Sequence, residues 1–224
     1  VMSEAYIVAA TRTAGGRKGG QLSGWHPADL AAQVIDELVR RTSADPARVD
    51  DVIMGCVSQI GEQSTNIARN AVLASGLPET VPATSVDRQC GSSQQAIHFA
   101  AQAVMSGTMD MVIASGVESM SRVPIGTPMD LPQKAGLGFY KSPGMEARYP
   151  EVFFSQFTGA EEIARTWELG REAMDEFSFQ SHLKSRAATE AGRFDAEIIA
   201  VEKRLHDGAV PGDMATRDEG IRYD

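Results

Sequence analysis

Two periods of apolar residues alternate along the first half of the chain. Short, mostly apolar runs bounded by turn residues predict strands at residues 5–11, 51–59, 82–88 and 109–117. Apolar positions three and four residues apart predict helices at residues 27–41, 65–75 and 90–105. Strands that alternate with helices are typical of an α/β fold, in which helices cover a sheet.

The composition of each element predicts how deeply it is buried. In the first of these helices, Leu30, Val34 and Leu38 lie on one stripe opposite polar residues, so we expect an outer, half-exposed helix. The helix that starts at Cys90 has little polar surface, so we expect it to be covered on most sides. The run at 109–117 is largely apolar, which predicts a buried central strand.

The pattern changes after Glu118. Five prolines interrupt any period up to about residue 157, at positions 124, 128, 132, 143 and 150. Loops of this length inside a compact domain usually carry function, so we expect the segment to take part in a site. Helical periods return at residues 158–168 and 171–191, followed by a strand-like run at 197–202.

Length, charge and hydropathy exclude several classes of protein. A chain of 224 residues with 42% hydrophobic residues can form a substantial core. Its formal net charge of -9 and the lack of a basic stripe argue against nucleic-acid binding. No apolar run is long enough to cross a bilayer, and the first residues lack a signal-peptide pattern. We therefore expect a cytoplasmic protein with no membrane partner.

Two local patterns resemble metal or phosphate sites without fitting them. Cys56 and Cys90 are far apart and in no metal-ligand spacing, so we expect neither a metal site nor a disulfide. Cys56 lies inside a strand-like run and is expected to be a buried structural residue. The GGRKGG stretch at 15–20 lacks the residues of a phosphate-binding loop, and we expect a flexible surface turn with Arg17 and Lys18 solvated.

The stretch DRQCGSSQQA, residues 87–96, places Cys90 between a short strand and a helix. The amide groups and positive dipole end of a helix N-terminus stabilise a thiolate, the reactive form of cysteine. Gly91 leaves room for a close approach, and Ser92 and Ser93 can satisfy amides of the first turn. Cys90 is therefore either a nucleophile or a structural cysteine that caps a core helix.

A cysteine nucleophile needs a base that takes and returns its proton. His98 is the nearest histidine in the sequence, but eight residues of helix would separate it from Cys90 by about 12 Å. His26 fits the lead-in of a helix, and His182 and His206 have the polar neighbours of a solvated surface. The chain therefore offers no evident base for this cysteine.

Several stretches occur together in a specific order. A short strand, DRQCGSSQQA, an apolar helix, an apolar strand and GVESMSRVP follow one another. Other characteristic stretches are ATRTAGGRKGGQLSG, GCVSQIGEQSTNIARNAVLASGLP, the long stretch from AEEIART to AEIIAV, and DEGIR. Each piece alone is weak, but the combination is specific. It resembles the thiolases, the acyl-CoA acetyltransferases of the thiolase superfamily.

The resemblance implies a fold, an activity and a division of the chain. Residues 1–118 would form the N-terminal layered βαβαβαβ half of the thiolase fold, an incomplete core with a mixed sheet. Residues 119–224 would form a mostly helical loop domain that covers the coenzyme A and acyl group. The activity would be cysteine-mediated ping-pong acyl transfer. It would run either as thiolysis of a 3-ketoacyl-CoA in fatty acid β-oxidation or as the reverse condensation of acetyl-CoA.

The resemblance also implies roles for single residues. Cys90 matches the acyl-accepting cysteine, whose backbone amide forms part of an oxyanion hole in the family. Arg222 is similar to an arginine that approaches the coenzyme A nucleotide. Ser155, Gln156 and Phe157 stand near the acyl pocket, where the family often has methionine next to glycine, so short-chain specificity is in doubt. Coenzyme A would be a substrate, and no cofactor would be bound permanently.

Other positions depart from the commonest form of the family. Asparagine is frequent where Asp87 stands, proline where Ala14 stands and glycine where Ser115 stands. Three motifs of the family's second half, an NEAFA-like asparagine, a GHP histidine and a CGG-like second cysteine, do not occur in residues 1–224. We therefore expect the chain to be part of a longer protein and to be inactive alone, because the base of Cys90 lies in that half.

Assembly and activity leave alternatives open. The family implies a homodimer paired through the strand at 82–88, or a homotetramer. A decarboxylating ketoacyl synthase shares the fold and the cysteine at the helix start, although RQCGSSQQA and GVESMS resemble the thiolase versions. A thiolase-like subunit without catalytic activity is a third interpretation. Only an enzyme would carry an acyl group on Cys90 after incubation with an acyl-CoA.

Overall fold

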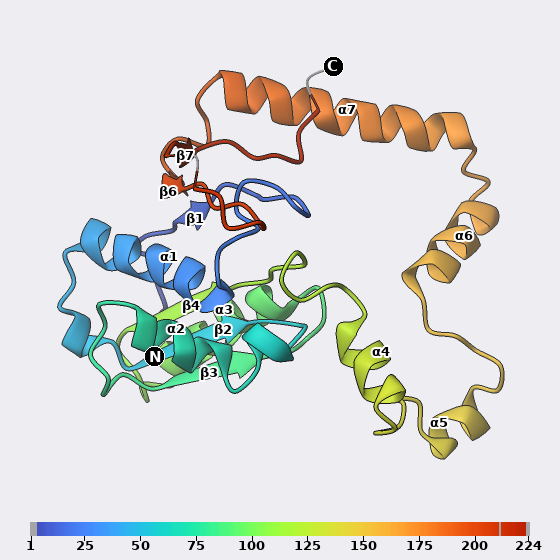
Figure 1. Cartoon of the computed structure of the whole chain (residues 1–224), viewed down its shortest axis with the longest axis horizontal. Coiled ribbons are helices and arrows are strands. Elements are labelled where there is room, and N and C mark those ends of the chain that lie inside the picture. The colour runs from blue at the N-terminus through green and yellow to red at the C-terminus, as the bar shows by residue number, and fades with distance from the viewer. Residues whose placement is uncertain (1–3, 211, 223–224) are drawn as a thin grey trace. The chain divides into compact units, whose positions relative to one another are not determined.

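Two compact units make up the molecule (Figure 1). Its structure is a computed structural model that describes residues 4–210 and 212–222. One unit comprises residues Val1–Pro128 and Asp195–Gly220, and the other comprises Met129–Phe194 and Ile221–Asp224. The sequence interpretation divided the chain once, after residue 118. The compact units divide it differently, because the segment 195–220 clusters with the first unit.

A parallel sheet of three strands organises the first unit. β2 (Asp51–Gly55) lies between β3 (Ala83–Val86) and β4 (Val112–Gly116). The helices α2 (Ile67–Ala74) and α3 (Ser92–Met105) each connect two of these strands. The predicted α/β class is confirmed. The prediction of a central strand at 109–117 is wrong, because the crossover through α3 carries the chain past β2 to the far edge of the sheet.

Alternating side chains of β2 build a core on both faces of this sheet. Val52 and Met54 belong to a buried cluster formed with α2 and with α1 (Pro27–Thr42). Ile53 points to the opposite face, where it packs against Ala96 of α3. The first unit thus has helices on both faces of its sheet, which is how parallel sheets are buried.

Short strand pairs join the two ends of the first unit. β1 (Arg12–Thr13) pairs in parallel with β5 (Ile198–Ile199). β6 (Val201–Glu202) pairs antiparallel with β7 (Met214–Ala215). The strand predicted at 197–202 is therefore divided between two pairs. Two 3₁₀ helices, at Pro46–Arg48 and Gly61–Gln63, complete the elements of this unit.

Helix α1 is half-exposed, as predicted. Its buried residues are Pro27, Ala28, Ala31, Ala32 and Ile35. Leu30 and Val34 are only partly buried, and they pack against a second cluster that contains Trp25 and residues of β5 and β6. The stripe of largest residues therefore does not mark the most buried face. Alanines occupy that face, where small side chains allow close packing between helices.

Two apolar segments that the sequence places inside the protein are exposed. Tyr6, Ile7 and Val8 of the predicted strand 5–11 are 76%, 81% and 84% exposed and form no strand. The outer face of α3 exposes Ile97, although we expected this helix to be covered on most sides. Both predictions are wrong because, within the described residues, neither the segment nor this helix face has an element packed against it. An apolar run without a pairing partner does not make a strand.

Four helices account for most of the second unit. α4 (Thr127–Lys134), α5 (Pro143–Arg148), α6 (Gln156–Thr166) and α7 (Arg171–Glu190) follow one another along the chain. The last two match the predicted helices, whereas the first two lie in the segment predicted as a loop. Proline starts α5 at its first position after the cap Ser142, where a proline is tolerated, so it does not interrupt the helix.

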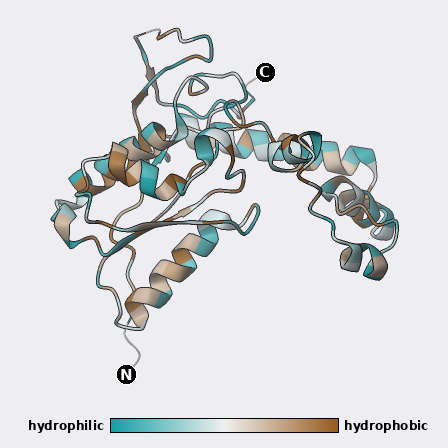
Figure 2. Cartoon of the chain, turned by 60° about the horizontal axis from the view of Figure 1, so that its bottom comes forward, coloured by the Kyte–Doolittle hydropathy of each residue, from teal (hydrophilic) through white to brown (hydrophobic). Residues whose placement is uncertain are grey.

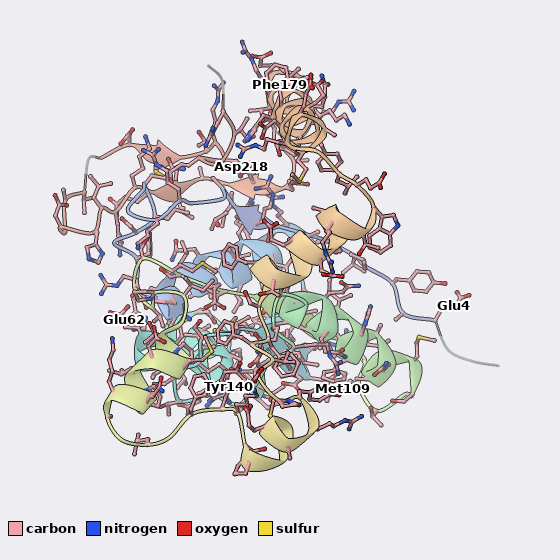
Figure 3. The ribbon with its side chains drawn as sticks, turned by 90° about the vertical axis from the view of Figure 1, so that its right-hand side faces the viewer. Glu4, Glu62, Met109, Tyr140, Phe179 and Asp218 are labelled. Carbon is pink, nitrogen blue, oxygen red and sulfur yellow. The ribbon has the colours of Figure 1, made fainter. Side chains whose placement is uncertain are left out.

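The helices of the second unit contain exposed and half-buried residues. None of the residues described in α4 to α7 is buried. Figure 3 looks nearly along α7, and side chains including Phe179 point outward from it on every side. Figure 2 shows hydrophobic and hydrophilic stretches mixed along the helices. Within the described residues, no helix is both long and apolar enough to cross a membrane.

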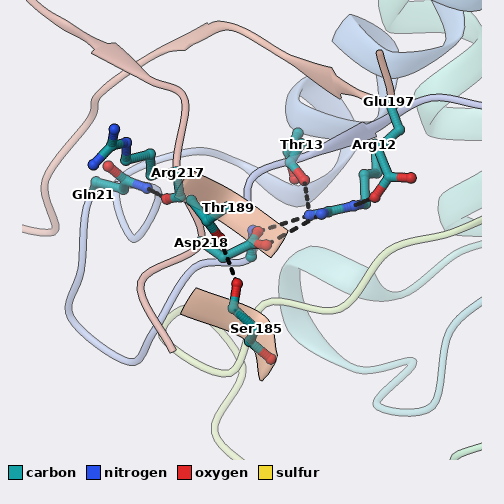
Figure 4. Close-up of polar contacts among 9 residues, drawn as sticks. Arg12, Thr13, Gln21, Ser185, Thr189, Glu197, Arg217 and Asp218 are labelled. Carbon is teal, nitrogen blue, oxygen red and sulfur yellow. Dashed lines mark hydrogen bonds and ion pairs between the residues drawn. The ribbon is translucent and has the colours of Figure 1, made fainter. Parts of the chain in front are cut away.

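Asp218 ties the end of the first unit to its beginning. Its carboxylate accepts hydrogen bonds from the Arg12 guanidinium at 2.7 and 3.1 Å and from the Gly15 amide at 2.6 Å. Arg12 also donates to Glu197 at 2.7 Å, as Figure 4 shows. Burial raises the pKa of Asp218, but the bonds from Arg12 and Gly15 outweigh burial and leave the pKa lowered.

Glu219 continues this contact along the loop at 15–21. Its carboxylate accepts hydrogen bonds from the amides of Arg17 and Gln21, each at 3.1 Å. Its own amide donates to the Gly15 carbonyl at 2.9 Å. The surface turn at 15–20 is exposed over residues 15–19, as predicted, but the carboxylates of Asp218 and Glu219 hold its backbone, contrary to the expected flexibility. The side chain of Arg17 remains exposed, as expected.

We predict that Asp218→Asn destabilises the first unit in a pH-dependent way. Replacing a partly buried, charge-assisted acceptor should cost about 1 to 3 kcal/mol of unfolding free energy at pH 7. The folded pKa lies below that of an unfolded aspartate, about 3.9, so this stabilisation is present above that value. It is lost as the pH falls through the folded pKa. Urea unfolding of both proteins between pH 7 and pH 3 measures the difference.

Asp213→Asn is the matched control. Asp213 is an exposed carboxylate that pairs with Lys203, so its replacement should change stability much less. Equal stabilities of wild type and Asp218→Asn at pH 7 would contradict the prediction. A difference that stays constant down to pH 3 would contradict the assigned role of the charge.

Candidate active site

Cys90 lies in a tight turn between β3 and α3. It is exposed and directly precedes Gly91, the N-cap of α3. The helix begins at Ser92, two residues later than the sequence predicts. Three strand ends and one helix start meet here, because β2, β3 and β4 are parallel and end at the same edge. Ligand and catalytic sites of open α/β sheets lie at such edges.

The hydroxyl of Ser92 closes this turn. It accepts a hydrogen bond from the Arg88 amide at 2.9 Å and donates one to the Gln89 carbonyl at 2.5 Å. Gln89 has a φ of 48°, in the left-handed region, and its amide donates to the Asp87 carboxylate at 2.7 Å. The expected role of Ser92 in capping the first helical turn is therefore wrong. It fixes the residues before the cysteine instead.

Two strand glycines form the floor under this turn. A Cβ at Gly55, in β2, would lie 2.7 Å from the Ser92 carbonyl oxygen. A Cβ at Gly116, in β4, would lie 2.7 Å from the Cβ of Ser93. Only glycine permits this approach of the sheet to the start of α3. Gly91 has no comparable neighbour, since a Cβ there would make an ordinary contact of 3.5 Å. The close approach that we expected at Gly91 therefore occurs at Gly55 and Gly116 of the sheet.

The second cysteine, Cys56, differs from Cys90 in its exposure to solvent. It follows Gly55 at the end of β2 and is buried, as expected. Burial first, and then the nearby Glu118 carboxylate, raise the pKa of the Cys56 thiol to about 12. A thiol in this environment stays protonated at neutral pH, so it is a poor nucleophile.

The histidines take part in structural contacts or lie on the surface. His26 caps α1, because its Nδ1 accepts the amide of Ala28 at 3.2 Å, as expected for a helix lead-in. In the second unit, Nδ1 of His182 accepts the amide of Arg222 at 3.2 Å. His98 and His206 are exposed. That the base for the cysteine lies outside this chain stays a prediction.

The proposed substrate-binding residues all belong to the second unit. Ser155 caps α6, and its hydroxyl accepts the amide of Phe157 at 3.2 Å. Gln156 is the first residue of that helix. Arg222 contacts α7 through its backbone. Cys90 is in the first unit, so the structure describes the two groups separately and their roles toward a substrate stay predictions.

Sequence reasoning missed a polar cluster formed by Glu118 and Gln63. Glu118 follows β4, Gln63 ends the 3₁₀ helix after β2, and the two side chains are joined by a hydrogen bond of 2.9 Å. The available signal was a glutamate directly after a predicted apolar strand. Among the described residues, no three His, Cys, Asp or Glu side chains are grouped as a metal site requires.

The sequence of this chain is similar to a family model and to proteins of known name. Residues 5–224 match the family model of the thiolase N-terminal domain. A steroid 3-ketoacyl-CoA thiolase of Mycobacterium tuberculosis is 52% identical over 207 residues, which are 90% of this chain and 50% of that protein. A 3-ketoacyl-CoA thiolase of Pseudoalteromonas translucida is 40% identical over 223 residues, 99% of this chain and 54% of that protein.

A solved structure is also similar to this chain in fold. The acetyl-CoA acetyltransferase of Bacillus anthracis superposes with a TM-score of 0.82 at 32% identity, over 100% of this chain and 56% of that one. The chain thus spans about half the length of the relatives it matches. The predicted thiolase fold is confirmed by this superposition. Because the family model extends over nearly every residue, the chain belongs to the thiolase family.

Proposed function

We propose that this chain carries the acyl-accepting cysteine of a thiolase that acts on 3-ketoacyl-CoA. The observation that supports this most directly is the position of Cys90, an exposed thiol in a fixed turn at the carboxyl edge of a parallel sheet. The names of the relatives support the substrate class, since several are 3-ketoacyl-CoA thiolases. A homodimer or homotetramer and a cytoplasmic location are further proposals, which rest on the family likeness.

The reaction divides into two acyl transfers. The sulfur of Cys90 attacks the 3-keto carbon, the bond between C2 and C3 breaks, and the leaving acetyl-CoA enolate takes up a proton. The remaining acyl group is then a thioester of the cysteine. The sulfur of a second coenzyme A attacks this thioester and releases the shortened acyl-CoA. The family resemblance implies that the backbone amide of Cys90 takes part in stabilising the oxyanion of each tetrahedral intermediate.

Only one of the two thiols suits this chemistry. Cys56 is buried, and its pKa of about 12 keeps it protonated. Cys90 is exposed, so a thioester can reach its sulfur. The proton from Cys90 needs a base, and we propose that a histidine from further sequence supplies it, as the family resemblance implies. Turnover would therefore need more than these residues.

The acyl group of the substrate is proposed to be bulky. The relative from Mycobacterium tuberculosis, at 52% identity, is named a steroid 3-ketoacyl-CoA thiolase. Ser155, Gln156 and Phe157 stand where the family often has methionine next to glycine, which also puts short-chain specificity in doubt. Comparing straight-chain and steroid-derived acyl-CoA as acyl donors to Cys90 tests this. Faster transfer from the straight-chain donor would contradict it.

We predict that acetyl-CoA acetylates Cys90. The folded chain should gain one acetyl group, located by peptide mass mapping, at least about 10-fold faster than the same cysteine in the urea-unfolded chain, because the turn orients the sulfur. Cys56→Ala should keep the modification and Cys90→Ala should lose it. If Cys90 reacts no faster than in the unfolded chain, the turn by itself does not activate the thiol and the prediction is wrong. A full-length protein that gains no acetyl group on Cys90 would be a non-catalytic thiolase-like subunit. Two catalytic histidines in the full-length protein would instead favour a decarboxylating synthase.

We also predict that iodoacetamide distinguishes the two cysteines. At pH 8 the folded chain should be alkylated at Cys90 at least about 100-fold faster than at Cys56, whose thiol is buried and protonated. In the unfolded chain both should react at similar rates. Mass mapping of the alkylated peptides over time gives both rates. If Cys56 in the folded chain is modified as fast as Cys90, Cys56 is not buried and the prediction is wrong.

A further inference from the structure

Glu118 gathers three hydrogen-bond donors from the segment that follows β2. It follows β4, and its Oε2 accepts the amide of Val57 at 2.8 Å. Its Oε1 accepts the amide of Ser58 at 3.3 Å and Nε2 of Gln63 at 2.9 Å. One partly buried carboxylate therefore joins the chain after β4 to the chain after β2.

The orientation of Gln63 requires an acceptor at this position. Gln63 is completely buried, and its Oε1 accepts the amide of Ser119 at 2.7 Å. Its Nε2 donates to the carbonyl of Ser58 at 2.9 Å. A backbone donor on one side and a backbone acceptor on the other prevent the amide from flipping. Nε2 must therefore face Glu118.

A carboxylate is the group that meets this requirement. Both of its oxygens accept and neither donates, so it can receive all three bonds at once. A glutamine of the same shape would have to turn its NH₂ group toward an N–H donor. One buried donor would then lose its partner, which costs about 1 to 3 kcal/mol.

The two segments joined by Glu118 lead directly to the floor under Cys90. Val57 lies two residues after Gly55, and Glu118 lies two residues after Gly116. The amide of Val117 donates to the Gly55 carbonyl at 3.0 Å, so the two strand ends are held as one piece. These are the glycines against which the first residues of α3 pack.

We infer that Glu118 is a positioning residue for the thiol of Cys90. It fixes the two strand ends, their glycines fix Ser92 and Ser93, and the hydroxyl of Ser92 fixes the turn that carries the cysteine. The consequence for catalysis rests on the proposed function. In an oriented acyl transfer, a displacement of about 1 Å can lower the rate about 100-fold.

Glu118→Gln tests the inference, with Glu62→Gln as the matched control. Glu62, labelled in Figure 3, is a nearby carboxylate that pairs with Arg122 at 2.9 Å and takes no part in the turn. Hydrogen exchange of residues 87–93 reports the turn directly and needs no acyl-CoA. Transfer from acetyl-CoA to Cys90 is measured in parallel over a range of acetyl-CoA concentrations. Urea unfolding establishes that each variant is folded.

Glu118→Gln should speed exchange at 87–93 about 10-fold and slow saturated acetyl transfer about 10- to 100-fold. The half-saturating acetyl-CoA concentration should stay within about 3-fold, because the variant misplaces the sulfur without touching the nucleotide. Glu62→Gln should leave all three quantities unchanged. Glu118→Asp keeps an acceptor but shortens its reach, so it should give smaller changes, and it decides the matter if Glu118→Gln does not fold.

Unchanged exchange at 87–93 in a folded Glu118 variant would overturn the inference, as would an equal loss in Glu62→Gln. A loss confined to the half-saturating concentration would assign Glu118 to substrate binding and would also overturn it. If the full-length protein, which would contain the proposed histidine base, shows no acetyl transfer to Cys90, the proposed function fails. The exchange rates then decide alone whether Glu118 positions the turn.

Discussion

The site depends on the absence of two side chains, at Gly55 and Gly116. These residues pair with one another across β2 and β4, and the first residues of α3 press against both. A methyl group at either position would occupy space that Ser92 or Ser93 already fills. The helix start can therefore sit close to the sheet, and Cys90 projects from a turn that the strands support. The chemistry proposed for this thiol follows from that packing.

Part of this could be predicted from the sequence. Regular apolar periods indicated most strands and helices of the first unit, and the sequence around Cys90 indicated its place between a strand and a helix. These features are local, since a strand or helix period is visible within about ten residues. The buried character of Cys56 was predictable for the same reason, because it ends the apolar run at 52–56.

Other features depend on partners that a local pattern does not reveal. The order of the strands depends on which way the crossover through α3 passes, so the apolar run at 109–117 was mistaken for the central strand. The run at 5–11 has strand composition but no strand beside it in the described residues. Glu118 and Gln63 are 55 residues apart, and only the parallel register of β2 with β4 brings them together.

Two carboxylates, those of Asp218 and Glu118, join distant chain segments of the first unit by hydrogen bonds. Asp218 and Glu118 each collect several N–H donors from chain segments that are distant in sequence. A carboxylate is suited to this task because it accepts through both oxygens and its charge strengthens every bond. A side-chain amide in its place would accept hydrogen bonds through its oxygen, but its NH₂ group would face another N–H donor. In an acidic chain, single carboxylates can therefore define specific internal contacts.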